Sequence, residues 1–441
     1  MVSLQEENTT LPVETGVGNY FISNYPPYSA WSRDQIPEMA AALDGLRPRE
    51  PLCLYVHLPF CSRRCRYCYF RVHAGSLKPA VDVYLDSLLT ELSLHLEHRA
   101  FRDRELIAAY FGGGSPSYLS EEQIRRLLGG LQERLSWDNL AECTFECEPA
   151  TTTAAKLAAL KELGVTRITL GFQTLDDAVL KLNGREARAR DSLAAFHLAR
   201  EAGFREINVD LLAGLPGETA QSWQETVERV LQLAPDCVTI YQFELTHNSI
   251  LYLQEGEACS PSLPNWAEKR RWVGRAFRKF EDVGYTVGSG YMAIRNSRNW
   301  KFVYTVDNFW HGGDLLALGE SAFGHLQGVH YQNSDSFTDY VTRLVDGQLP
   351  LWRARRLTGE EQLRREVILQ LKTGVLDAGY FSSKYGVDLR EKFQEELEGL
   401  RRDHLLEFAG GRILLTRDGL LKVDWLLPRF YLPEHRGIRY T

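Results

Sequence analysis

An alternation of strand-like and helix-like stretches runs from Pro51 to Asp282 and constrains the fold more than any other feature. Six apolar runs, each followed by helical sequence, begin at positions 51, 105, 143, 165, 206 and 237: PLCLYVHL, ELIAAYF, CTFECE, VTRITLGF, EINVDLLAGLP and CVTIYQFEL. Units of roughly 30 residues are typical of right-handed crossovers between parallel strands. Six in succession predict an α/β fold with a partial or full (β/α) TIM-like barrel. No strand–GxGxxG–helix fingerprint indicates a flat dinucleotide-binding sheet instead.

The barrel divides the chain into four regions. We expect an N-terminal extended segment at 1–50, the barrel at 51–284, a barrel extension with a substrate pocket at 285–350, and a C-terminal domain at 351–441. The first segment is aromatic and proline-bearing over residues 19–31, so it packs either over the mouth of a site or on the outside of the core. Helices followed by a hairpin over 405–416 predict a mainly helical, winged-helix-like last domain.

Composition narrows the classes of partner. The 441 residues are 44% hydrophobic and 25% charged, which is ordinary for a soluble protein. A net charge of -7 gives no general attraction to nucleic acid, and no apolar run is long enough for a membrane span. Eight cysteines in a clustered arrangement and an N-terminus without a signal-peptide pattern predict a cytoplasmic, reducing location.

Three cysteines lie directly after the first strand-like run. Cys61, Cys65 and Cys68 fall within the sequence YVHLPFCSRRCRYCYF, with three and then two residues between them. Structural zinc sites usually have four ligands in two pairs, and no second pair follows here. Three thiolates suit an iron–sulfur cluster whose fourth iron is open to another ligand. The alternative is that they are small buried hydrophobic residues.

Polar and glycine residues follow the next strands at corresponding positions. In parallel barrels the working residues gather at the carboxyl ends of the strands. The glycine run can bring backbone groups close to a ligand, or simply make a tight turn. The carboxylates can hold an ammonium group or a ribose diol, or form structural salt bridges. The residues at these strand ends are Gly112, Gly113, Gly114, Ser115, Glu146, Glu148, Gln173, Arg185 and Asp210.

The motifs together resemble a known superfamily. The cysteine spacing, with Tyr67 before the third cysteine, is similar to that of the radical S-adenosylmethionine (SAM) superfamily. The strings YVHLPFC, FGGGSPS, FECEP, GFQT and VDLLAGLPGET resemble the branch that contains oxygen-independent coproporphyrinogen III oxidase. The resemblance is strong over Pro51 to Asp282 and looser in the helical C-terminal region.

This resemblance implies a 4Fe–4S cluster on Cys61, Cys65 and Cys68. SAM would chelate the open iron, and one electron from a flavodoxin- or ferredoxin-type donor would cleave it to a 5′-deoxyadenosyl radical. The branch also accommodates a second SAM molecule. The residues implied as SAM contacts are Tyr55, Phe70, Gly112, Gly113, Gly114, Ser115, Glu146, Gln173, Arg185 and Asp210.

Phe70 bears on which member of the branch the chain resembles. The decarboxylating oxidase has a further cysteine at this position, and its N-terminal segment and the sequence after the sixth strand are not clearly matched here. A second relative, the haem chaperone group, keeps an aromatic residue there and has a histidine-containing element before a GGD motif. Here that element is TVDNFWHGGD, with Asp307 in the place of the histidine and His311 displaced after the tryptophan.

A third group, the class C radical SAM methyltransferases and related cyclopropane-forming enzymes, also has phenylalanine at this position. Our leading hypothesis is therefore an enzyme that uses a second SAM to methylate or cyclopropanate an sp2 carbon of a small-molecule substrate. The aromatic stretch from Tyr291 to His311, which includes Trp300, would line its pocket or form a second packed layer. The catalytic candidates are Tyr241, Glu244, Tyr291, Tyr304 and His311. The alternatives are oxidative decarboxylation of coproporphyrinogen and non-enzymatic haem binding.

Overall fold

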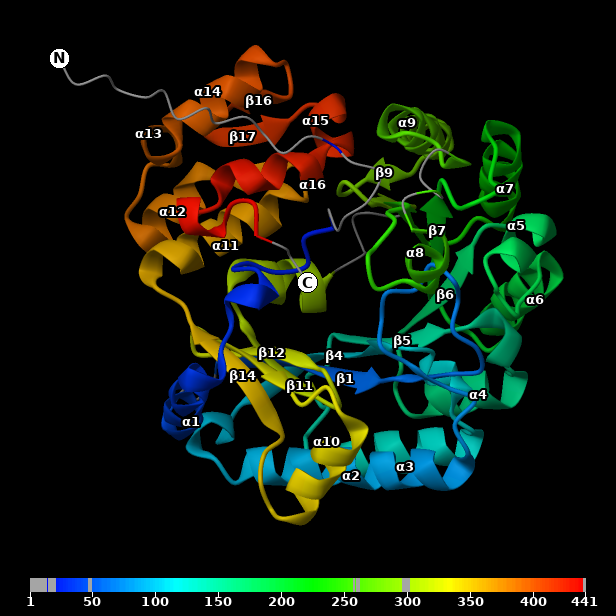
Figure 1. The fold of residues 1–441 in the computed structure, drawn as a ribbon, viewed down its shortest axis with the longest axis vertical. Coiled ribbons are helices and arrows are strands. Elements are labelled where there is room, and N and C mark those ends of the chain that lie inside the picture. Colours follow the sequence, from blue (N-terminus) through cyan, green and yellow to red (C-terminus); the bar gives the residue numbers. More distant parts are fainter. Residues whose placement is uncertain are drawn as a thin grey trace.

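One twelve-stranded sheet organises the molecule (Figure 1). The computed structural model describes residues 14, 21–46, 50–256, 258, 262–295 and 302–438, so Trp300 lies outside the described residues. The strand order is β14-β13-β12-β11-β1-β4-β5-β6-β7-β8-β10-β9. The strands are β1 (Pro51–Leu58), β4 (Glu105–Gly113), β5 (Glu142–Cys147), β6 (Arg167–Gln173), β7 (Glu206–Ala213), β8 (Cys237–Gln242), β9 (Thr286–Val287), β10 (Met292–Ile294), β11 (Asp314–Leu318), β12 (Phe323–Leu326), β13 (Val329–Asn333) and β14 (Leu351–Arg356).

The centre of this sheet consists of the six strands expected from the sequence. β1, β4, β5, β6, β7 and β8 are neighbours in chain order and pair in parallel throughout. Their apolar runs alternate with helices, as the pattern predicts. The sheet stays open, with β14 at one edge and β9 at the other. The structure is therefore a partial barrel and not a closed one.

Residues 285–350 extend this sheet at both edges. β10 pairs with β8 in an antiparallel arrangement, and β9 pairs with β10. At the other edge β11 runs parallel to β1, and β12, β13 and β14 follow as antiparallel neighbours. A π-helical turn, η7 (Val303–Asn308), packs with Cys53 and Ala108 of the strands.

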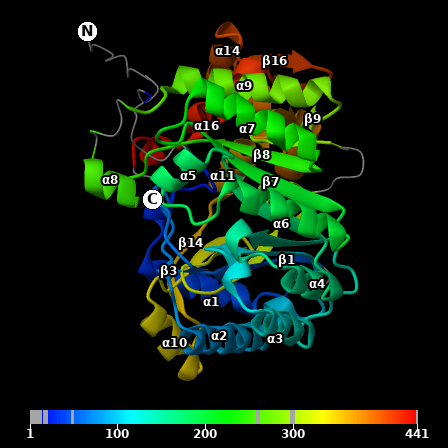
Figure 2. The same ribbon diagram turned by 90° about the vertical axis from the view of Figure 1, so that its right-hand side faces the viewer.

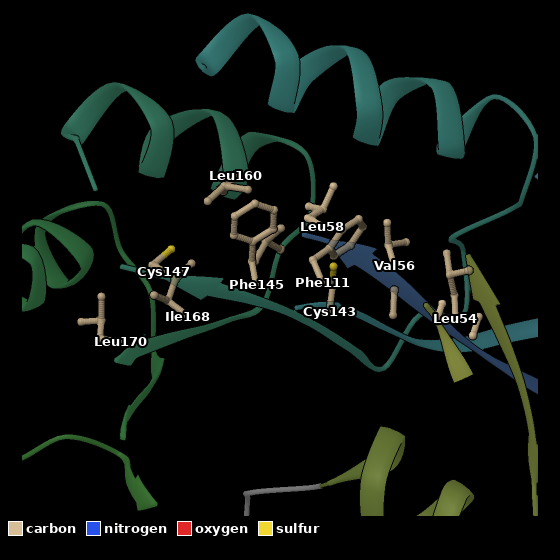
Figure 3. Close-up of a cluster of buried hydrophobic side chains, with 14 of the residues drawn as sticks. Leu54, Val56, Leu58, Phe111, Cys143, Phe145, Cys147, Leu160, Ile168 and Leu170 are labelled. Atoms are coloured by element: carbon tan, nitrogen blue, oxygen red, sulfur yellow. The ribbon is translucent and has the colours of Figure 1, made fainter. Parts of the chain in front are cut away.

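Helices cover the outer face of the sheet (Figures 1 and 2). Between the helices and the strands lies the main apolar core, in which Leu54, Phe111, Phe145 and Ile168 are fully buried (Figure 3). The helices of this part are α1 (Ile36–Asp44), α2 (Lys78–Leu96), α3 (Glu121–Gln132), α4 (Ala154–Glu162), α5 (Asp177–Leu182), α6 (Ala189–Glu201), α7 (Ala220–Leu233), α8 (Ile250–Glu255), α9 (Trp266–Asp282) and α10 (Phe337–Val345). No described helix is both long and apolar enough to cross a membrane.

The C-terminal region has its own apolar core and a small sheet. β16 (Leu406–Ala409) and β17 (Arg412–Leu415) form the expected hairpin, and β15 (Val375–Asp377) adds a third strand. Ile22 and Tyr25 of the N-terminal segment are buried in the same core. The two ends of the chain are thus packed together. The helices here are α11 (Gly359–Leu371), α12 (Ala378–Tyr385), α13 (Leu389–Lys392), α14 (Gln394–Arg402), α15 (Arg417–Leu421) and α16 (Val423–Leu426).

Candidate active site

A cavity of about 430 Å³ opens at the carboxyl ends of the parallel strands. Its wall includes the loop after β1, the ends of β4 to β8, and residues from both ends of the chain. This is the edge at which parallel α/β sheets bind their ligands, because the loops that follow the strands gather there.

The cysteine loop forms one end of this cavity. Cys61 ends the two-residue strand β2 (Phe60–Cys61), which pairs with β3 (His73–Ala74). The backbone N–H of Cys68 donates to the carbonyl of Cys65 at 3.2 Å, which makes a tight turn. The backbone of Arg66 is held on both sides, by the carbonyl of Asn183 at 3.0 Å and the N–H of Leu251 at 2.7 Å. All three cysteine side chains face the cavity.

Burial determines how the thiols titrate. It raises the pKa of Cys61 to about 11, against an opposing hydrogen bond from Ser115. It raises the pKa of Cys68 to about 12, and the neighbouring Cys65 adds to the increase. Without a metal these two thiols stay protonated at neutral pH. A metal site here would have to displace their protons, since thiolate is the form that coordinates metal.

Arg185 connects the cysteine loop to the strand ends. Its Nη2 donates to Glu148 at 2.6 Å, and both side chains are largely buried. Its Nη1 lies 3.3 Å from the hydroxyl of Tyr67 and 3.9 Å from the sulfur of Cys65. A third contact reaches the carbonyl of Gly171 in β6. The guanidinium therefore fixes the loop relative to two strands.

Two carboxylates at strand ends titrate near neutral pH. Burial raises the pKa of Glu146 to about 7, even though the hydroxyl of Tyr110 donates to it at 2.6 Å. Burial raises the pKa of Asp210 to about 6, and Asn208 donates to it at 2.8 Å. Both side chains line the cavity. They can exchange protons with a bound ligand or accept its hydrogen bonds.

The glycine run is required by close packing with the loop after β1. A Cβ on Gly114 would lie 2.7 Å from the carbonyl oxygen of Phe60, and the N–H of Gly114 donates to Leu58 at 2.9 Å. Gly113 has a φ of +110°, and a Cβ there would meet the ring of His57 at 2.6 Å. Both glycines also line the cavity. Gly113 and Gly114 therefore form a tight turn and also expose their backbone to the cavity.

Aromatic rings form the opposite end of the cavity. Tyr241 lies one residue before the end of β8, Tyr291 precedes β10, and Phe21 comes from the N-terminal segment. The ring centroid of Phe21 lies 5.5 Å from Tyr241 and 5.4 Å from Tyr291, both edge-to-face. Glu244 accepts the backbone N–H of Phe21 at 3.2 Å. This end suits a large, flat apolar group with polar donors.

Two family models match separate parts of this chain. The Radical SAM superfamily model matches residues 55–230, and the HemN C-terminal domain model matches residues 357–421. An oxygen-independent coproporphyrinogen III oxidase of Pseudomonas aeruginosa is 29% identical over 92% of this chain and 91% of its own length. Residues 55–230 therefore form a radical SAM domain, and the chain as a whole resembles the HemN-like branch of that superfamily.

Further relatives resemble this chain over most of its length. A haem chaperone HemW of Bacillus subtilis is 29% identical over 83% of this chain and 96% of its own length. The solved structure of coproporphyrinogen III oxidase (HemN) from Escherichia coli, described as a radical SAM enzyme, is 26% identical and superposes with a TM-score of 0.79. The superposition covers 93% of this chain and 96% of the Escherichia coli chain. The sequence predicts that the likeness to the oxidase weakens after the sixth strand, but the match to the HemN C-terminal domain over 357–421 lies beyond that strand.

A radical SAM domain implies a 4Fe–4S cluster and SAM. Among the described residues, no three His, Cys, Asp or Glu side chains are close enough to hold a single metal ion. A cluster fits the three cysteines better, because its three irons hold thiolates farther apart than one ion does. The Oε1 atom of Glu148 is buried and has no hydrogen-bond partner in the described part of the chain. It is available to a polar group of a bound ligand.

The structure brings most of the expected SAM contacts to one cavity. Those that line it are Phe70, Gly113, Gly114, Ser115, Glu146, Gln173, Arg185 and Asp210. Gln173 adopts a φ of +67° at a register shift of β6, a costly conformation that is common at functional sites. Gly112 and Tyr55 lie outside the lining. The hydroxyl of Tyr55 instead bonds the Nδ1 of His57 at 2.9 Å.

The five candidates for substrate chemistry also divide into residues that line the cavity and residues that lie outside it. Tyr241, Glu244 and Tyr291 line the cavity. Tyr304 does not: its ring stacks on Tyr110 at 5.0 Å, one layer behind the wall. His311 is also outside, with its Nδ1 2.6 Å from the carbonyl of Val306. The stretch after residue 302 thus forms the packed layer that was the alternative to a pocket wall.

Three further residues complete the aromatic end: Phe21 belongs to the segment 19–31, which the sequence predicts either over the mouth of a site or on the outside of the core, while Asp424 and Lys372 had no signal in the sequence. Phe21 and Asp424 line the cavity from opposite ends of the chain, and Lys372 lies behind them. The N–H of Ile22 donates to Asp424 at 3.3 Å across 402 positions of sequence. No spacing rule relates residues so far apart, so only the folded chain shows them together.

Proposed function

We propose that this HemN-like radical SAM enzyme acts on a porphyrinogen that carries propionate groups and decarboxylates them oxidatively. The observation that carries the proposal is the extent of the likeness to relatives named as coproporphyrinogen III oxidases. It covers nine-tenths of both chains and includes the C-terminal region that forms the cavity wall. The two-SAM alkylation that the sequence favours receives no support from the comparisons.

Each decarboxylation in this proposal takes up one electron and releases one electron. When bound and given one electron by an external donor, the cluster and SAM would supply methionine and a 5′-deoxyadenosyl radical able to remove one hydrogen atom from the propionate carbon next to the ring. The carbon–carbon bond to the carboxylate then breaks, carbon dioxide leaves, and a vinyl group remains. One electron passes to an acceptor outside this chain. The role of the protein is to hold the two reacting carbons together and to exclude water.

Basic side chains on the cavity wall suit a substrate with carboxylates. Arg185 and Arg270 pair with Glu148 and Glu14, respectively. Arg63, in the cysteine loop, and Lys422, in the C-terminal wall, also line the cavity and have no ion-pair partner among the described residues. These two cations are therefore our candidates for holding the propionates.

A product assay tests this function. Cluster-loaded protein would be mixed anaerobically with SAM, a reductant and coproporphyrinogen III. We expect 5′-deoxyadenosine, carbon dioxide and a vinyl-bearing porphyrinogen in proportion, and no product from a Cys65→Ala variant. Formation of 5′-deoxyadenosine without any consumption of coproporphyrinogen would contradict the proposal.

One observation keeps two-SAM alkylation as a second candidate. Phe70 lines the cavity at the position where we expect the oxidase to have a cysteine, and its ring stacks on Tyr69 at 4.5 Å. Release of S-adenosylhomocysteine together with 5′-deoxyadenosine would favour this function. Haem binding, suggested by the HemW relatives, would instead appear as a shift of the haem absorbance on mixing.

A further inference from the structure

Asp424 is the point at which four parts of the chain meet beside the cavity. It lies in α16 and lines the cavity wall. Its Oδ2 accepts the hydroxyl proton of Tyr291 at 2.6 Å, and its Oδ1 accepts the N–H of Ile22 at 3.3 Å. The ammonium of Lys372 lies 3.5 Å from Oδ1. Its side chain is 20% exposed, so the carboxylate is still accessible from the cavity.

Lys372, which pairs with Asp424, lies on the side of that carboxylate away from the cavity. Lys372 is 1% exposed and is absent from the cavity lining. Its ammonium lies 4.0 Å from the ring centroid of Phe21 and 5.1 Å from that of Tyr291. A cation in this position balances the charge of the Asp424 carboxylate from behind the wall, without offering a donor to a ligand in the cavity.

Tyr291 is oriented by the same contact. A phenol has one proton, and in Tyr291 that proton is directed at Asp424. Toward any other polar group the oxygen of Tyr291 can therefore act only as an acceptor. Together, Tyr291 and Asp424 form a surface that accepts hydrogen bonds and cannot easily donate them.

We propose that Tyr291 and Asp424 bind the pyrrole N–H groups of the substrate, with Lys372 as a positioning residue. This inference rests on the proposed function: a porphyrinogen has four N–H donors at its centre and no acceptor there. The aromatic rings of Phe21 and Tyr241 next to this surface suit the pyrrole faces. The propionates at the ring edge are then left to Arg63 and Lys422.

Binding without turnover tests the assignment. Cluster-loaded protein with SAM but no reductant would be titrated anaerobically with coproporphyrinogen III, and the fluorescence of Trp266 and Trp425 on the cavity wall would report binding. We expect Asp424→Asn and Tyr291→Phe each to weaken binding by about 10- to 100-fold, as expected for lost hydrogen bonds that involve a charged group. Asp403→Asn, an exposed carboxylate of the same domain that pairs with Arg429, is the matched control and should bind as the wild type does.

Further readouts separate this role from a structural one. Both variants should retain the cluster absorbance of the wild type, which a general loss of the fold would not allow. The double variant should lose less than the product of the two single losses, because the two residues act as one unit. Loss of the cluster from both variants, or equal substrate binding by wild type and Asp424→Asn, would overturn the roles of Tyr291 and Asp424. Either outcome would leave the proposed function standing. Failure of the wild-type protein to bind coproporphyrinogen III would overturn the proposed function as well.

Discussion

The guanidinium of Arg185 donates to the carboxylate of Glu148 at 2.6 Å and lies 3.9 Å from the sulfur of Cys65. The side chains of this pair are only 6% and 14% exposed. One ion pair thus fixes the position of the cysteine loop against the ends of the strands. Its removal would act on the cluster and on the strand-end carboxylates at the same time.

We predict that Arg185→Ala lowers both stability and SAM cleavage. Leaving Glu148 buried without its cation should reduce the free energy of unfolding by about 3 kcal/mol, the usual cost of breaking a buried pair. Chemical denaturation and the yield of 5′-deoxyadenosine would measure the two effects. Arg190→Ala, which removes a side chain that is 78% exposed, should change neither. Unaltered stability of Arg185→Ala would contradict the structural role of the pair.

The cysteine loop gives a second prediction. Replacing Cys61, Cys65 or Cys68 with Ala should abolish the visible absorbance of the reconstituted cluster, because each would provide one of its three protein ligands. Cys143→Ala, a change in the buried core away from the cavity, should leave that absorbance in place. An intact cluster in all three loop variants would overturn the site.

The titration of Glu146 gives a third prediction. Burial raises its pKa to about 7, so the folded protein binds this proton more tightly than the unfolded chain does. This residue therefore favours folding below pH 4.5 and opposes it progressively up to about pH 7, by about 3 kcal/mol in total. Unfolding of the wild type and Glu146→Gln, without cofactors, would be compared at pH 5 and pH 8. The neutral variant should gain relative stability at pH 8, and an equal difference at both values would contradict the prediction.

The glycine turn gives a fourth prediction. Gly114→Ala would place a methyl group 2.7 Å from the carbonyl oxygen of Phe60, and the backbone there cannot easily move. We expect the free energy of unfolding to fall by about 1–3 kcal/mol, as in overpacked sites. Gly129→Ala is the matched control, since a Cβ there meets nothing within 4 Å and the residue lies inside α3. That change should stabilise the protein by about 0.5–1 kcal/mol.

A fifth prediction concerns Phe70, which is 43% exposed at the edge of the cavity. Phe70→Cys should fold and carry its cluster normally, since no core packing is lost. If this residue limits decarboxylation, the variant should consume coproporphyrinogen III at least several-fold faster than the wild type. Measurement of both rates with equal cluster loading would check this. An unchanged rate would show that the position does not decide the reaction.

The parallel strands could be read from the sequence because their signal is local. Each apolar run is bounded by turn residues, and β1 begins and ends at Pro51 and Leu58, as the pattern indicates. The cavity residues at the strand ends followed from the same regularity. The role of the stretch 302–311 could not be read in this way. Its aromatic residues have the composition of a pocket wall, and only the stacking of Tyr304 on Tyr110 and the packing of Phe309 in the same apolar cluster show that they fill the interior. At the aromatic end, Tyr241, Glu244 and Tyr291 were among the sequence candidates, and all three line the cavity. The meeting of Phe21, Lys372 and Asp424 was out of reach, because it exists only after folding.

The bond between Ile22 and Asp424 closes a loop of 402 residues. During synthesis, the strands and the cysteine loop are complete long before residue 424 leaves the ribosome. The half of the cavity that we assign to the cluster and SAM can therefore form first, while the half that we assign to the substrate is still open to water. The finished wall is assembled last, from the first and the final segments of the polypeptide. A truncated chain would carry the radical-forming machinery without the means to direct it.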